Sequence, residues 1–108
     1  MHAARGTHVA FLDDDCVPQA DWLASYESCL GKHPHDLLGG PVTNALPHVP
    51  FSTASQMLVE YLYEYYGRGE NRSRFFVTSN MLVPRADFIA IGEFDRTFPI
   101  AAAEDRDL

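Results

Sequence analysis

The chain has 108 residues, and its 15 acidic side chains against 8 basic ones give a formal net charge of −7. This length corresponds to one domain, and a composition that is 46% hydrophobic and 12% aromatic excludes an intrinsically disordered chain. The acidic balance argues against nucleic acid as a partner, because phosphate backbones are bound mainly through Lys and Arg. No apolar run approaches the ~20 residues that span a bilayer, and no signal peptide is recognisable, so we expect no membrane span and a cytoplasmic location.

Predicted strands and helices alternate in the first half of the chain, which is typical of an α/β domain. Residues 8–12 form an apolar run that predicts a buried strand ending against three acidic residues. The helical spacing of apolar residues over 22–30 predicts a helix that Gly31 ends. Residues 37–42 predict a second strand, in which Gly39 and Gly40 mark a close approach of the backbone to another group.

A long helix is predicted between residues 50 and 67, with Ser52 or Thr53 as its N-cap. Five apolar residues mark one face of this helix, and we expect that face to lie in the core: Met57, Leu58, Tyr61, Leu62 and Tyr65. The polar segment 67–74, which carries three Arg and one Glu, is either a solvated loop or a source of positive charge for a phosphate-bearing ligand.

The remaining elements are a third strand and a short helix. Residues 75–79 predict the strand. Pro84 is expected to open the helix, with Phe88 and Ile91 turned inward and Gly92 at its end. The two cysteines, Cys16 and Cys29, have no metal-binding spacing, so we expect free thiols that behave as small buried hydrophobic residues.

Three consecutive carboxylates, Asp13, Asp14 and Asp15, follow the first predicted strand. Side chains alternate along a strand, so Asp13 and Asp15 are expected to point the same way. Like charges this close repel, and a divalent cation such as Mg²⁺ or Mn²⁺ is the usual compensation. The simpler interpretation, a solvated acidic turn or a helix N-cap cluster, remains open on this motif alone.

A second acidic cluster, Glu104, Asp105 and Asp107, lies at the other end of the chain. Two separate carboxylate clusters suit a metal-assisted transfer, in which one cluster holds the ion and the other accepts a proton. Haloacid-dehalogenase phosphohydrolases offer an alternative, since Asp13 and Asp15 match their strand-end Asp-x-Asp motif. That family also needs a downstream Lys, and the one Lys of this chain is Lys32.

Several motifs resemble those of family 2 glycosyltransferases with the GT-A fold. The matching blocks are VAFLDDDCVP at 9–18 with DWL at 21–23, GGP at 39–41, TSNMLVPR at 78–85, IGEFD at 91–95 and EDRDL at 104–108. They are similar to that family's DxD region and to its N-M-x-x-x-R, G-x-F-D and E-D-x-D-L segments, in the same order. The resemblance implies a Rossmann-like, mostly parallel sheet flanked by helices over residues 1–108.

The resemblance also implies roles for individual residues. Asp15 would bind the divalent metal, Mg²⁺ or Mn²⁺, while Asp13 and Asp14 would lie against the ribose and the water shell of the metal. Ser79 and Asn80 would form the floor of the site for the donor sugar and the acceptor. Trp22 is not implied to bind sugar, and we expect it to pack.

The implied reaction transfers a sugar, with inversion, from a nucleotide-diphosphate donor, foremost a UDP-sugar, to a hydroxyl of a saccharide or lipid-linked acceptor. Asp105 would be the general base that deprotonates this hydroxyl, and Glu104 would orient the acceptor or the base. Such transfers serve cell wall or polysaccharide biosynthesis. The enzyme would work in the cytoplasm, including at the inner face of the membrane.

The family's chain has nucleotide-binding strands ahead of the DxD region, whereas residues 2–6 are too few to form them. We therefore expect a single incomplete catalytic domain, a central fragment that is inactive alone. The alternative is a non-enzymatic truncated remnant with residual metal binding.

Overall fold

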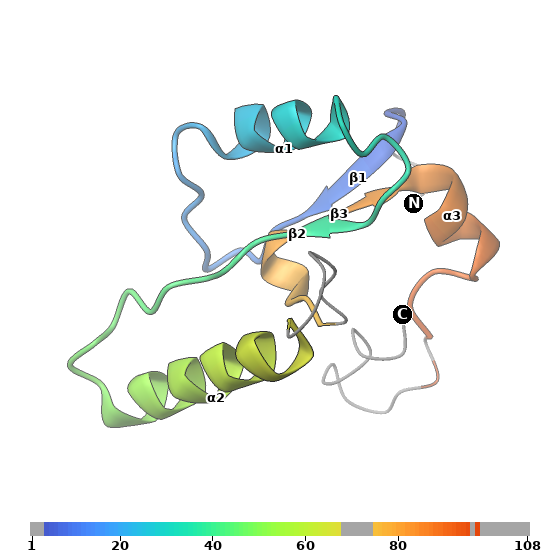
Figure 1. Ribbon diagram of the computed structural model, residues 1–108. Coiled ribbons are helices and arrows are strands. Elements are labelled where there is room, and N and C mark those ends of the chain that lie inside the picture. The colour runs from blue at the N-terminus through green and yellow to red at the C-terminus, as the bar shows by residue number, and fades with distance from the viewer. Residues whose placement is uncertain (1–3, 68–74, 96, 98–108) are drawn as a thin grey trace.

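The structure is a computed structural model that describes residues 4–67, 75–95 and 97 (Figure 1). This part of the chain is mixed α/β, which confirms the predicted class. Its elements in order are β1 (His8–Phe11), α1 (Trp22–Leu30), β2 (Leu38–Gly39), α2 (Pro50–Tyr66), the 3₁₀ turn η1 (Thr78–Asn80), β3 (Met81–Pro84) and α3 (Arg85–Ala90). None of the helices in these residues is long and apolar enough to cross a membrane.

The three strands form one sheet in the order β1-β3-β2. Strand β3 runs antiparallel to both neighbours, with Met81 opposite Phe11 on one side and opposite Gly39 on the other. In the described residues every strand pairing is therefore antiparallel, unlike the mostly parallel sheet expected from the sequence. The reason is the path of the chain, which leaves β2, passes through α2 and re-enters the sheet at the same edge (Figure 1).

The third strand begins later than the sequence predicts. Residues 75–79 are not a strand, because the bond from the Asn80 N–H to the Val77 carbonyl (3.1 Å) belongs to a 3₁₀ turn. The strand is formed instead by Met81–Pro84, whose first three residues are all buried. Residues paired on both sides and covered on their faces are the natural centre of a sheet.

The core lies between β3, β1 and α3. Phe88, on α3, is only 2% exposed, and its ring meets that of Phe11 edge-on at 5.3 Å between centroids. Phe94 completes this aromatic cluster with a similar edge contact to Phe11. The prediction for Phe88 is confirmed, but Ile91 is 57% exposed, because α3 has already ended and Gly92 turns the chain with a φ of +97°.

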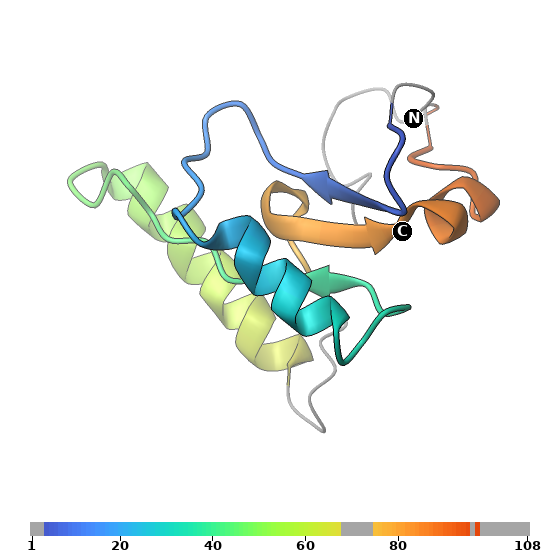
Figure 2. The same ribbon diagram turned by 90° about the horizontal axis from the view of Figure 1, so that it is seen from above.

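Helix α1 has the predicted bounds, and seen from above it lies on the β2 side of the sheet, with β1 and β3 left uncovered by the helix (Figure 2). Its C-cap is Gly31, as predicted, although in the right-handed conformation. Tyr26 is its one buried residue. The two cysteines are free, as expected, but Cys29 on this helix is exposed and Cys16 half-buried, so neither is a buried hydrophobic residue.

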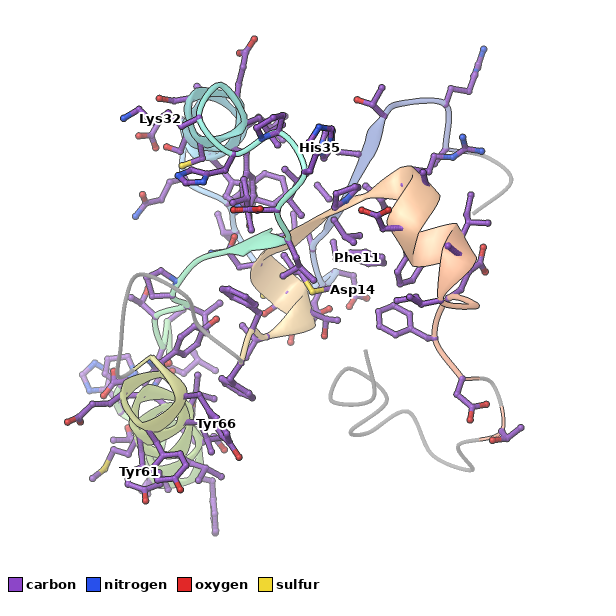
Figure 3. All side chains as sticks on the ribbon, turned by 45° about the vertical axis from the view of Figure 1, so that its right-hand side comes forward. Phe11, Asp14, Lys32, His35, Tyr61 and Tyr66 are labelled. Atoms are coloured by element: carbon purple, nitrogen blue, oxygen red, sulfur yellow. The ribbon has the colours of Figure 1, made fainter. Side chains whose placement is uncertain are left out.

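Helix α2 differs from its prediction at its start and in its orientation. Its N-cap is Val49, ahead of Pro50, so neither Ser52 nor Thr53 caps it. The face expected in the core points outward: four of its residues are exposed, namely Met57, Leu58, Tyr61 and Tyr65. Figure 3 shows Tyr61 on the side of α2 away from the sheet. The helix meets the sheet through the opposite face, where Tyr63 is half-buried.

Candidate functional site

The candidate site lies at the edge of the sheet where β1 and β2 end and β3 begins. Because both Phe11 and Gly39 pair with Met81, the residues after β1 and β2 continue beside those that precede β3. The Gly40 N–H extends this pattern with a bond to the Asn80 carbonyl (3.1 Å). Three loops far apart in the sequence thus meet at one edge of the sheet.

The first of these loops contains a tight turn at residues 13–16, which we call the acidic turn. It is closed by a bond from the Cys16 N–H to the Asp13 carbonyl (3.1 Å). The turn gathers one oxygen each from Asp13 and Asp15 and the Cys16 sulfur within 4.8 Å of one another. The two carboxylates lie together as expected, but the cause is a β-turn and not the alternation of a strand.

Asp14 is exposed and is not part of this group of three ligand atoms. Cys16 is a member that the sequence analysis did not include, although its place directly after the aspartates puts it in the same turn. Partial burial raises the pKa of the Cys16 thiol, and the charges of Asp15 and Asp13 raise it further. A side-chain hydrogen bond with Ser79 acts in the opposite direction.

Ser79 and Asn80 approach the acidic turn from the start of β3. Ser79 is the residue that lowers the pKa of the Cys16 thiol, as described above. The Asn80 carboxamide oxygen accepts two hydrogen bonds from α1, from the Trp22 indole N–H (2.8 Å) and the Tyr26 hydroxyl (2.7 Å). Its Nδ2 donates to the Pro41 carbonyl (3.0 Å). Trp22 also contacts the Tyr26 ring edge-on, so it packs, as expected.

The two glycines at the end of β2 are required by this arrangement. A Cβ on Gly39 would overlap the Phe76 ring, and a Cβ on Gly40 would stand 2.7 Å from Asn80 Nδ2. The predicted close approach of the backbone at these positions is therefore confirmed.

Helix α2 is attached to the same edge through Tyr63. Its hydroxyl donates to the Gly40 carbonyl (2.8 Å) and accepts from the Val77 N–H (3.3 Å). Burial raises the pKa of Tyr63 and so favours the neutral hydroxyl that can do both. Gln56 adds a bond from its side-chain amide to the Val42 carbonyl (2.9 Å). The sequence analysis missed Tyr63 because it placed the opposite face of the helix inward.

The structure thus brings together four of the predicted site residues: Asp13, Asp15, Ser79 and Asn80. Glu104 and Asp105 lie outside the described residues, as does most of the Arg-containing segment 67–74. The carboxylates of the acidic turn are exposed to solvent, where an ion could reach them without opening the fold.

Comparison with known proteins gives no relative: no protein-family model, no curated protein and no solved structure matches the chain. The resemblance to family 2 glycosyltransferases therefore rests on the sequence motifs alone.

Proposed function

We propose that the chain carries part of the active site of a metal-assisted, inverting glycosyltransferase of family 2, with a partial GT-A fold. The observation that carries the proposal is the acidic turn, in which two carboxylates and a thiol come within 4.8 Å at the carboxyl end of β1. Strand β2 ends and β3 begins at the same edge, so residues from three loops can reach a ligand held there. The substrate would be a nucleotide-diphosphate sugar, foremost a UDP-sugar, and the acceptor a saccharide or lipid-linked hydroxyl.

The donor atoms of the acidic turn fit a small divalent cation. Mg²⁺ and Mn²⁺ prefer oxygen ligands and are commonly bound by one or two carboxylates together with substrate phosphates. Asp15 would hold the ion, with Asp13 beside it, and the exposure of both leaves room for a diphosphate. A bound ion would supply positive charge that stabilises the departing nucleotide diphosphate.

The chain's own residues would orient the donor and remove a proton. Ser79, at the start of β3 beside the ends of β1 and β2, would hydrogen-bond a donor group held at the acidic turn. Asp105 would take the proton of the acceptor hydroxyl as its oxygen attacks the anomeric carbon, while Glu104 orients the acceptor. One displacement in line inverts the anomeric configuration, and no covalent intermediate on the protein is needed.

The phosphohydrolase alternative gains no support. Its chemistry needs a Lys beside the aspartates, and the one Lys in the sequence follows the far end of α1. About 14 Å of helix lies between Trp22, which is hydrogen-bonded at the site edge, and the end of that helix.

The test is calorimetric titration of the full chain with UDP, with and without Mn²⁺. We expect binding that depends on Mn²⁺ and that Asp15→Asn abolishes. Asp87→Asn is the matched control, because Asp87 is an exposed carboxylate on α3, which follows the opposite end of β3. Asp105→Asn should also keep the affinity for UDP, because the base acts on the acceptor. UDP binding that is indifferent to Mn²⁺, or unchanged in Asp15→Asn, would refute the proposal.

A further inference from the structure

The side chain of Asn80 connects the start of β3 to α1 and to the segment that follows β2. Its carboxamide oxygen is shared by Trp22 and Tyr26 on α1, and its Nδ2 is bound to the Pro41 carbonyl beyond β2. Its own carbonyl accepts the Gly40 N–H. The Asn80 side chain thus links α1 to the end of β2 by hydrogen bonds.

The orientation of this carboxamide follows from its partners. An indole N–H can only donate, so the atom that faces Trp22 must be the oxygen. A backbone carbonyl can only accept, so the atom that faces Pro41 must be the NH₂ group. Both lone pairs of the Asn80 oxygen are therefore used within the protein. A sugar hydroxyl could donate to this oxygen only by displacing Trp22 or Tyr26.

The partners of Asn80 flank the acidic turn. Helix α1 begins at Trp22, where the loop that contains the acidic turn ends. On the other side, Asn80 directly precedes Met81, which pairs with Phe11, two residues ahead of Asp13. Fixing Asn80 therefore restrains the acidic turn from both sides, through α1 and through the pairing of β1 with β3.

We propose that Asn80 is a positioning residue, which fixes the acidic turn for cation binding while its carboxamide oxygen is held by Trp22 and Tyr26 and is closed to the donor sugar. This inference rests on the proposed function, because it takes the acidic turn to be the metal site. It replaces the sugar-binding role that the family resemblance implies for Asn80. Residues that orient a metal site without touching the ion commonly matter for affinity.

The test is the affinity for Mn²⁺ alone, measured by calorimetry on the full chain. Asn80→Ala is expected to weaken Mn²⁺ binding about tenfold, the lower end of what loss of an orienting partner costs. Tyr26→Phe removes one donor and a single oxygen atom, and Trp22→Phe removes one donor together with part of the indole ring; each should weaken Mn²⁺ binding about threefold. Trp22 is the only Trp in the sequence, so its emission reports the network directly. In Asn80→Ala its maximum should move to longer wavelength as water replaces the lost acceptor.

Two controls separate positioning from stability. Val83→Ala destabilises the core toward the other end of β3, where Val83 pairs with Val9, and Tyr61→Phe removes an exposed hydroxyl; both should keep the Mn²⁺ affinity within about twofold. An Asn80→Ala protein that shifts Trp22 emission but binds Mn²⁺ as tightly as these controls would overturn the inference. If Asn80→Ala does not fold, unchanged affinity in both Tyr26→Phe and Trp22→Phe overturns it. Unchanged affinity in Asp15→Asn would refute the metal site itself, and the inference with it.

Discussion

Strand β3 and helix α2 are both rich in apolar residues, yet those of β3 are buried and many of those of α2 are exposed. Met81, Leu82 and Val83 in β3 are all buried, whereas the 17 residues of α2 include none that is. The strand has a neighbour on each side and helix α3 following it, while α2 meets the rest of the protein along one face. Apolar content alone therefore does not say which element carries stability; the number of covered faces does.

The candidate site lies between these two regions. Its acidic turn and its Asn80 network are attached to β1, β3 and α1, and Tyr63 adds α2 to the same edge through the Gly40 carbonyl. Substitutions in the β3 and α3 region should therefore affect the whole fold, and those on the outer face of α2 should hardly matter.

The largest effect is expected from Phe88→Ala, which removes the most buried ring of the core. The free energy of unfolding should fall by about 3–5 kcal/mol, from lost burial and the cavity left behind. Urea denaturation followed by circular dichroism measures it. A loss below about 1 kcal/mol would mean that the core lies elsewhere.

Gly39→Ala should follow, because the added methyl group overlaps the Phe76 ring. Overpacking of this kind costs about 1–3 kcal/mol. Gly31→Ala is the matched control: Gly31 has right-handed dihedral angles and its Cβ would stand 3.4 Å from the nearest atom, the Ser28 carbonyl oxygen. Equal free energies of unfolding for the two variants would show that β2 does not approach Phe76.

Tyr26→Phe tests the link between α1 and the sheet. Removal of the hydroxyl should cost about 1 kcal/mol at neutral pH. Burial raises the pKa of Tyr26 to about 12, above the value of a tyrosine in the unfolded chain. The folded state thus favours the protonated hydroxyl, so this stabilisation is complete below pH 10 and is lost as the pH rises towards 12.

The pH dependence is tested by comparing the free energies of unfolding of the variants and the unmodified chain. Between pH 10 and 12 the free energy of unfolding should fall less in Tyr26→Phe, because this variant lacks the Tyr26 hydroxyl that ionises in the unfolded state. Tyr61→Phe, which removes an exposed hydroxyl, is the matched control and should follow the unmodified chain. The same decline in all three proteins would contradict a buried Tyr26 hydroxyl.

The smallest effect is expected from Leu58→Ala on the outer face of α2. Leu58 is 56% exposed, so its truncation should change the free energy of unfolding by no more than about 0.5 kcal/mol. Leu82→Ala, the same change in β3, should cost about 2–5 kcal/mol. Comparable losses for the two leucines would show that the outer face of α2 is covered in solution.

Local sequence signals predicted several elements well. The helical spacing ahead of Gly31 gave the bounds of α1, and the glycines at 39 and 40 marked a real close approach. Tertiary properties were predicted less well. The spacing of Met57 and Tyr61 identifies a face of α2 but not its direction, because Tyr63 on the opposite face finds the hydrogen bonds at the sheet edge.

The site, too, combines features that local sequence predicts with features that only the tertiary structure determines. The consecutive aspartates predicted a gathering of carboxylates, and the structure shows it. Cys16 directly follows the aspartates, so its membership of the turn had a local signal that was not used. The use of Asn80 as a link to Trp22 had none, because it depends on the strand register. The antiparallel entry of β3, which creates that register, follows from the path of the chain through α2.

The central claim is that the edge where β1 and β2 end and β3 begins binds a divalent cation. The most direct measurement is the paramagnetic broadening of backbone amide signals by substoichiometric Mn²⁺, in nuclear magnetic resonance spectra of the full ¹⁵N-labelled chain. We expect selective broadening at residues 13–16 and at Gly40, Ser79 and Asn80, and its disappearance in Asp15→Asn. Broadening centred on other carboxylates, such as Asp36 or Glu60, or broadening that persists unchanged in Asp15→Asn, would contradict it.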